Sequence, residues 1–258
     1  MARDDPAPAP LDPQLVLGAY SVGVFPMADA RTADSVYWVE PKHRAILPLD
    51  GFHLSRSLRK TLATDRFRIT ADTAFDRIID LCAEAAEDRP DTWINRQIEQ
   101  VFVELHRRGF AHSIEVWDGE RLAGGLYGLA LGRAFFGESM VSRARDASKV
   151  AIAWLIARLR VGGFRLLDCQ FMTDHLASLG AIEILRADYL GLLSGALEGV
   201  ATGPSGVTSG GASDGDFFAL DRAGASLAPL SEAPPPPAAT ESGPPTGKVI
   251  AQLLTQTS

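Results

Sequence analysis

The sequence contains few cysteines and no long apolar run, and these absences exclude several classes of protein. Its 258 residues include two cysteines, Cys82 and Cys169, which are too few to supply the disulfide framework of a small secreted domain. No apolar run approaches the roughly 20 residues that a membrane-spanning helix needs. The N-terminal stretch MARDDPAPAP has acids and prolines where a secretion signal would have a basic and then an apolar segment. We therefore expect a cytoplasmic protein without a membrane partner.

The chain also lacks a recognisable metal-binding pattern. Its histidines are His43, His53, His106, His112 and His175. Neither these side chains nor the two cysteines recur at the spacing of a zinc site, so we expect no metal. We expect His112 and His175 to form hydrogen bonds with buried backbone groups.

Charge is distributed unevenly, although the net charge of −7 argues at first sight against a nucleic-acid partner. Residues 42–68 contain seven basic side chains and two acids, a local excess of +5, whereas the residues from Glu198 onward contain six acids and two bases. A basic patch of this kind is sufficient for a modest contact with a phosphate backbone. The alternative is a solvated face with scattered arginines.

Apolar periodicity predicts an α/β protein with a mixed sheet. The predicted helices span residues 13–23, 55–63, 73–82, 92–108, 146–160 and 173–179, with caps at Asp12, Ser55, Asp72 or Thr73, Asp91-Thr92, and Asp146 or Ser148. The predicted strands span residues 111–117, 121–132, 133–140, 164–170 and 181–185. Asp118-Gly119 is a strong signal for a tight hairpin, which makes the first three strands an antiparallel meander. Gly124, Gly125 and Gly128 indicate bulges or close backbone approach, and residues 36–49 predict edge strands or extended loop.

The composition divides the chain into three parts. Residues 1–62 are predicted to form a small N-terminal domain, and residues 63–197 the main α/β domain. In residues 198–258 Gly, Ser, Ala and Pro dominate, which predicts a disordered tail. Phe217-Phe218 and the segment VIAQLL near the C-terminus are either weak docking segments or incidental apolar residues of that tail.

Polar side chains occur at the ends of two predicted strands on either side of a predicted helix. Glu138 lies in the first strand, and Asp168, Cys169 and Gln170 end the second. Strand alternation places Asp168 and Gln170 on one face and Cys169 on the other. Two carboxylates and an amide at neighbouring strand ends predict a functional site. The alternative is that Asp168 and Gln170 only cap the helix that follows.

Several segments together resemble the leucyl/phenylalanyl-tRNA–protein transferases. They are AYSVGVFPM (19–27), the stretch from WVEPKHR to SLRK (38–60), TWIN (92–95), LHRRGFAHSIEVW (105–117), LAGGLYGLALGRAFFGESM (122–140), SRARDASKVA (142–151) and LLDCQFMTDHLASLGAIEI (166–184). They occur in the family's order and cover nearly all of residues 11–190. GGLYG, FFGESM, DCQ and HLASLGA are highly specific in combination, whereas each alone is a weak signal.

This resemblance implies a GNAT-like (acetyltransferase-type) mixed-sheet catalytic domain behind a smaller N-terminal α/β domain. It implies transfer of Leu, Phe or, less readily, Met from aminoacyl-tRNA to proteins that begin with Arg or Lys, which marks them for N-degron degradation. The ester is already activated, so no cofactor is expected, and we expect a monomer. Acetyl-CoA enzymes of that fold hold pyrophosphate in a Gly-rich loop, and the corresponding segment here, SRARDASK, has no glycine.

The resemblance also implies roles for individual residues. Gln170 would contact the attacking amine, Asp168 would orient or polarise Gln170, and Glu138 would give electrostatic or hydrogen-bonding support, or would bind the acceptor's Arg or Lys side chain. A proton relay and a substrate-assisted route both remain open. The substrate-binding residues would be Met27, Trp93, Leu126, Phe135, Gly137, Met140, Ile152, Leu155, Leu159 and Leu167, with Met27 in place of a tryptophan found in some relatives. The tRNA-binding residues would be Lys42, Arg44, Arg56, Arg59 and Lys60.

Two other functions remain as alternatives. One is a CoA-dependent N-acetyltransferase on the same fold. The other is an inactive adaptor that binds tRNA or degrons, although the presence of Asp168, Gln170 and Glu138 argues against a loss of activity.

Overall fold

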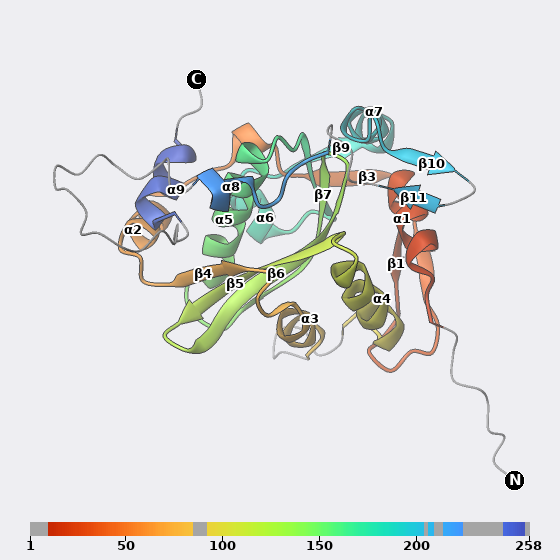
Figure 1. The fold of residues 1–258 in the computed structure, drawn as a ribbon, viewed down its shortest axis with the longest axis horizontal. Coiled ribbons are helices and arrows are strands. Elements are labelled where there is room, and N and C mark those ends of the chain that lie inside the picture. The colour runs from red at the N-terminus through yellow and green to blue at the C-terminus, as the bar shows by residue number, and fades with distance from the viewer. Residues whose placement is uncertain (1–9, 85–91, 204–205, 209–213, 224–244, 256–258) are drawn as a thin grey trace, which may run out of the picture.

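The computed structural model describes residues 10–84, 92–203, 206–208, 214–223 and 245–255, and Figure 1 shows their arrangement. The helices are α1 (Pro13–Ser21), α2 (Arg56–Ala63), α3 (Phe75–Ala83), α4 (Arg96–Arg107), α5 (Ala147–Val161), α6 (Asp174–Ser178), α7 (Arg186–Ala196), α8 (Ala219–Ala223) and α9 (Gly247–Leu253), with a 3-10 turn at Leu49–Gly51. The strands are β1 (Phe25–Met27), β2 (Tyr37–Val39), β3 (His43–Ile46), β4 (Arg68–Ala71), β5 (Ala111–Asp118), β6 (Arg121–Leu131), β7 (Ala134–Ser142), β8 (Leu166–Gln170), β9 (Ile182–Leu185), β10 (Ala201–Gly203) and β11 (Gly206–Thr208). None of the described helices is long and apolar enough to cross a membrane.

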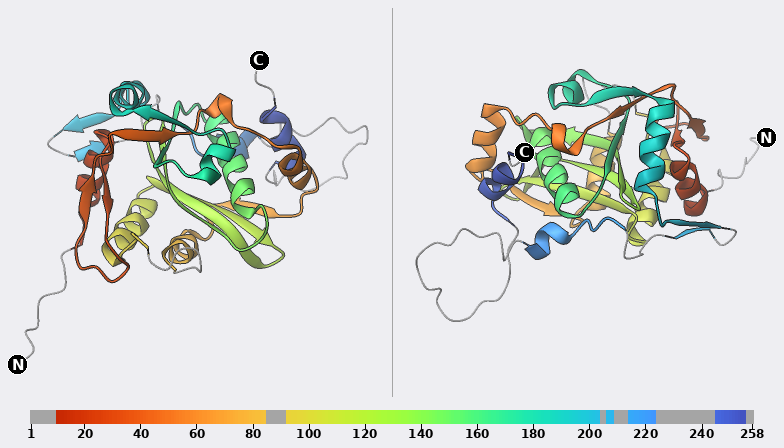
Figure 2. Two further views of the ribbon diagram at one scale, coloured as in Figure 1. Left: turned by 180° about the vertical axis from the view of Figure 1, so that it is seen from behind. Right: turned by 90° about the horizontal axis from the view of Figure 1, so that it is seen from above.

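A seven-stranded mixed sheet in the order β4-β5-β6-β7-β8-β3-β9 organises the molecule. Strands β7 and β8 pair in parallel, and all the other neighbours in this sheet are antiparallel. Helix α5 connects the parallel pair and packs on one face, while α3 and α4 cover the other face (Figures 1 and 2). Strands β1 and β2 form a separate two-stranded sheet. The predicted mixed α/β sheet is confirmed.

The meander β5-β6-β7 forms as the sequence predicts. The hairpin turns at Asp118-Gly119, where Gly119 has a φ of 63°, a value that glycine adopts without strain. Gly125 also has a packing reason, because a Cβ there would lie 2.4 Å from both the Ile114 carbonyl oxygen and the Ile78 side chain. The central strand can therefore approach its neighbours closely only with glycine at this position.

Strand β3 and the starts of three helices differ from the sequence prediction, which also lacks strand β4 and helix α7. Strand β3 is an interior strand between β8 and β9, not an edge strand or loop. Helix α4 is capped by Asn95, which accepts from the Ile98 N–H at 3.0 Å, so Thr92 is not its cap, and Asp91 lies outside the described residues. Helix α3 has no side-chain cap at its own N-cap position. Instead, the buried Glu115 carboxylate of β5 accepts from the backbone N–H groups of Thr73 and Ala74, which immediately precede the helix. Asp146 occupies the N-cap position of α5 but forms no side-chain capping hydrogen bond there.

The prediction of a disordered tail from residue 198 is wrong for much of what the structure describes. Phe217, Leu220, Ile250 and Leu254 are at most 4% exposed and belong to the core around α5. Apolar residues spaced along a Gly- and Pro-rich segment are enough to dock short helices on a large existing core, which composition alone does not reveal. Residues 224–244 lie outside the described part of the chain.

Candidate active site

A cavity opens where β7 and β8 diverge. Their parallel pairing ends at Phe136 and Asp168, although β7 continues to Ser142 and β8 to Gln170. Side chains of both strands beyond that point line a cavity of about 440 Å³. Because the cavity lies in the gap between strands, Cys169 lines it as well as Gln170, despite their alternation.

Most of the predicted substrate-binding residues lie on the cavity wall. These are Met27, Trp93, Leu126, Gly137, Met140, Ile152, Leu155 and Leu167. Phe135 and Leu159 do not line it. Both are fully buried in the core, so their prediction as direct substrate contacts is wrong. The wall is otherwise largely apolar, as a cavity for an aliphatic or aromatic side chain requires.

Glu138 lies at the polar rim of this cavity between two donors. The Tyr20 hydroxyl donates to Glu138 Oε1 at 2.8 Å, and the Gln170 side-chain N–H donates to the same oxygen at 3.0 Å. Burial raises the pKa of the Glu138 carboxyl to about 8, with Asp168 adding to the rise and the hydrogen bonds from Tyr20 and Gln170 opposing it. Burial and the neighbouring Glu138 also raise the pKa of the Tyr20 phenol, so Tyr20 remains a donor. The predicted proximity of Glu138 and Gln170 is present in the structure.

Asp168 lies beneath the rim and is fully buried. Arg44 Nε and Nη2 donate to its two oxygens at 2.6–3.0 Å, and the Tyr189 hydroxyl donates to Oδ2 at 2.8 Å. Burial by itself lowers the pKa of Arg44, but the Asp168 carboxylate more than offsets this and raises it. This ion pair excludes Arg44, which is 1% exposed, from the predicted contact with tRNA phosphates.

Gln170 is held in an unusual backbone conformation. Its φ of 56° lies in the left-handed region, which costs a residue other than glycine about 1–2 kcal/mol. The Asp168 carboxylate compensates by accepting from the Gln170 backbone N–H at 2.8 Å. Asp168 therefore orients Gln170 through the main chain. Since the Gln170 amide N–H bonds to Glu138, its amide oxygen remains as an acceptor at the cavity.

Sequence reasoning missed Tyr20, Tyr189 and the true role of Arg44. Tyr20 lies within the family motif AYSVGVFPM, so the motif could have identified it as a site residue. Tyr189 lies beyond the last family motif, so no such signal was present for it. The other predicted tRNA contacts, Lys42, Arg56, Arg59 and Lys60, are exposed, and their role stays a prediction.

The histidines also differ from expectation. His112 Nδ1 bonds the Asp72 carboxylate at 2.7 Å, so the prediction that it bonds a backbone group is wrong. His175 lines the cavity, and its Nε2 is buried without a hydrogen-bond partner among the described residues. Burial lowers the pKa of His175, with Lys149 adding to the effect. Within the described part of the chain, no three metal-ligating side chains gather into a possible metal site.

Comparison with known proteins identifies relatives over nearly the whole chain. Residues 46–194 match the family model "Leucyl/phenylalanyl-tRNA protein transferase", and residues 9–42 match the model of that family's N-terminal domain. A leucyl/phenylalanyl-tRNA–protein transferase from Rhizorhabdus wittichii is 60% identical over 96% of this chain and 99% of its own length. Its counterpart from Novosphingobium aromaticivorans is 47% identical over all of both chains, and that from Zymomonas mobilis is 62% identical over 74% of this chain and 72% of its own. The chain therefore belongs to the leucyl/phenylalanyl-tRNA–protein transferase family.

Proposed function

We propose that the protein, an aminoacyl-tRNA–protein transferase by its family, carries out the transfer at the cavity between β7 and β8. The donor is leucyl- or phenylalanyl-tRNA and, less readily, methionyl-tRNA, and the acceptor is the α-amine of a protein that begins with Arg or Lys. The product would enter N-degron degradation. The observation that carries the proposal is the 3.0 Å bond between Gln170 and Glu138 at the rim of an apolar cavity of about 440 Å³.

The proposed chemistry is aminolysis of an ester. The amine nitrogen attacks the carbonyl carbon of the aminoacyl group, the peptide bond forms, and the bond to the terminal ribose oxygen breaks. The amine loses a proton and the ribose oxygen gains one. An α-amine has a pKa near ~8, so a useful fraction is already neutral. The protein's contribution is mainly positioning and proton transfer.

The rim residues fit these tasks. The Gln170 amide oxygen can accept a hydrogen bond from the attacking amine. Glu138, with a pKa of about 8, can exchange a proton near neutral pH. Both donors to Glu138 use Oε1, which leaves Oε2 as the atom that carries that proton. A carboxyl that is largely protonated at neutral pH attracts an arginine weakly, which favours its hydrogen-bonding role over recognition of the acceptor side chain.

We further propose that the large sheet is GNAT-like and that the enzyme acts as a monomer. Divergence of two parallel strands with the site in the gap supports the first proposal. The presence of the whole cavity within one chain supports the second. The domain boundary near residue 62 stays a prediction. Strand β3, which precedes this boundary in the sequence, belongs to the large sheet.

The test is transfer of radiolabelled amino acid to an Arg-initiated peptide. Leucyl- and phenylalanyl-tRNA should serve as donors, whereas isoleucyl-tRNA and an N-acetylated peptide should not react. Gln170→Ala should lower kcat/KM by about 100-fold, the order expected for loss of a positioned catalytic group, while Ser178→Ala, an exposed site outside the cavity, should not. Transfer from acetyl-CoA instead would support the acetyltransferase alternative. tRNA binding without transfer would support the adaptor.

A further inference from the structure

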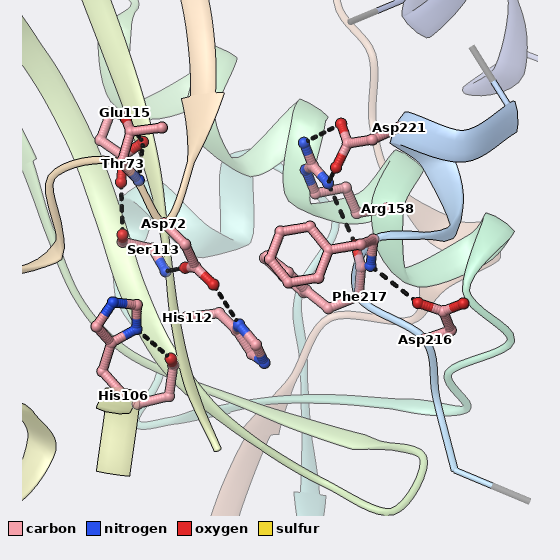
Figure 3. Close-up of polar contacts among 12 residues, drawn as sticks. Asp72, Thr73, His106, His112, Ser113, Glu115, Arg158, Asp216, Phe217 and Asp221 are labelled. Carbon is pink, nitrogen blue, oxygen red and sulfur yellow. Dashed lines mark hydrogen bonds and ion pairs between the residues drawn. The ribbon is translucent and has the colours of Figure 1, made fainter. Parts of the chain in front are cut away.

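The segment Asp214–Ala223 docks on the face of the sheet that α5 covers, beyond the residues that the main family model matches. Its central side chain is Phe217, which is 4% exposed. The Phe217 ring stacks on His112 with centroids 4.2 Å apart and on Phe135 with centroids 5.8 Å apart, both within 15° of parallel. Figure 3 shows Phe217 beside His112, which Asp72 holds by a hydrogen bond.

The segment is fixed to α5 by a nearly inaccessible arginine. Arg158, 2% exposed, donates from Nη1 and Nη2 to the two Asp221 oxygens at 2.6 and 2.7 Å, and from Nη1 to the Phe217 carbonyl oxygen at 3.2 Å (Figure 3). A bidentate bond of this kind specifies orientation as well as attraction. The position of the Phe217 ring is therefore determined by contacts at both its side chain and its backbone.

Phe135 connects Phe217 to the cavity. A Cβ at Gly128 would lie 2.4 Å from the Phe135 ring, so the ring rests directly on the β6 backbone, two residues from Leu126. Across the parallel ladder, Phe135 is paired with Leu167. Leu126 and Leu167 both line the cavity, so Phe135 lies directly behind its wall and Phe217 packs behind Phe135.

We propose that Phe217 is a specificity-determining residue, which limits the depth of the donor cavity by holding Phe135 against its back wall. This inference rests on the proposed use of that cavity for the donor side chain. Without Phe217, the Phe135 ring can move into the vacated space and the cavity becomes deeper. The kcat/KM for donors with larger side chains then rises relative to that for the leucine donor. A segment that only stabilised the fold would change kcat/KM for all donors alike.

The test compares Phe217→Ala with Phe218→Ala. Phe218 is the adjacent aromatic residue of the same segment, packs on the same core and forms no ring contact with Phe135. We expect Phe217→Ala to raise the ratio of kcat/KM for tryptophanyl-tRNA over leucyl-tRNA by about ten-fold, the lower end of what one methylene-sized change in a pocket gives. Phe218→Ala should leave the ratio within two-fold of the wild type. Phe217→Leu, which keeps an apolar side chain, should give an intermediate ratio and serves as the variant to test should the alanine protein not fold.

Donor preference can also be measured in the absence of transfer. The measurement is the ratio of the dissociation constants of two non-reactive donor analogues, 3′-leucylamido-adenosine and 3′-tryptophanylamido-adenosine. Absence of transfer in the wild type would count against the proposed function, while these binding ratios would still decide the role of Phe217. An unchanged ratio in folded Phe217→Ala and Phe217→Leu proteins, or an equal loss for all donors, would overturn the inference.

Discussion

Glu138 shows how a single residue links burial to chemistry and to stability. Burial raises the pKa of its carboxyl to about 8, above the value near 4.5 of an unperturbed glutamate. At a pH between these two pKa values, the Glu138 carboxyl keeps its proton in the folded protein but releases it in the unfolded chain. The free energy of unfolding therefore contains a contribution that is fully present below pH ~4.5 and is lost as the pH rises toward 8.

This predicts a pH-dependent effect of Glu138→Gln. Glutamine is neutral at every pH, so the variant lacks this contribution and its melting temperature should rise relative to that of the wild type between pH 5 and pH 9. Thermal melts in matched buffers at unit pH steps measure the difference. A difference between the two proteins that does not change with pH would show that the carboxyl titrates in the fold as it does in the unfolded chain.

At the residue scale, the sequence predicts which polar groups meet but not how they are paired. Glu138, Asp168 and Gln170 could be identified because polar residues at strand ends depart from the core pattern, and the family motifs contain them. Arg44, the partner of Asp168, could not be identified from the sequence, because it lies in a basic run that has the composition of a surface patch. Only the interior placement of β3 reveals that this one arginine is directed inward.

At the scale of elements, the C-terminal helix α9 lies in a segment that the sequence predicts to be disordered. It packs on α2 and α5 through Ile250, which is fully buried, and its first N–H donates to Asp65. Arg160 of α5 donates to the Leu253 carbonyl oxygen at 3.0 Å. A seven-residue helix cannot be stable alone, so its stability comes from contacts distant in sequence, which local pattern does not show.

We therefore expect Ile250→Ala to destabilise the protein. Removing a fully buried isoleucine side chain typically costs about 2–5 kcal/mol of unfolding free energy. Urea denaturation measures this, and Lys248→Ala, an exposed site on the same helix, serves as the matched control with an expected change within about 0.5 kcal/mol. Equal unfolding free energies of the two variants would show that α9 does not pack on the core, as the prediction of a disordered tail requires.

At the scale of the whole molecule, the sheet could be predicted because its strands follow a clear period and a hairpin signal. The cavity could be predicted only in part, since most of its lining residues have the same apolar character as the core. Phe135 and Leu159 illustrate the limit. Both are fully buried and do not line the cavity, although their sequence pattern is the same as that of residues that do.

Charge distribution gives the prediction that involves the whole protein, because the net charge of −7 disfavours tRNA binding whereas the exposed basic face of α2 is predicted to contact the tRNA. Arg56, Arg59 and Lys60 are exposed on this short helix, whose N-cap Ser55 accepts from the Leu58 N–H. Contacts to phosphates release counterions, so affinity should fall steeply with salt.

Replacing Arg56, Arg59 and Lys60 together with alanine should weaken binding of leucyl-tRNA and reduce the slope of log K against log salt by about 2–3, roughly one for each lost contact. The measurement is a binding titration from 50 to 200 mM salt. The double variant Arg107→Ala/Arg108→Ala is the control, because it removes two exposed cations at the end of α4 while the α2 patch stays intact. If the triple variant keeps the wild-type slope, or the α4 control loses as much of it, the tRNA is bound by another face and α2 is only a solvated basic helix.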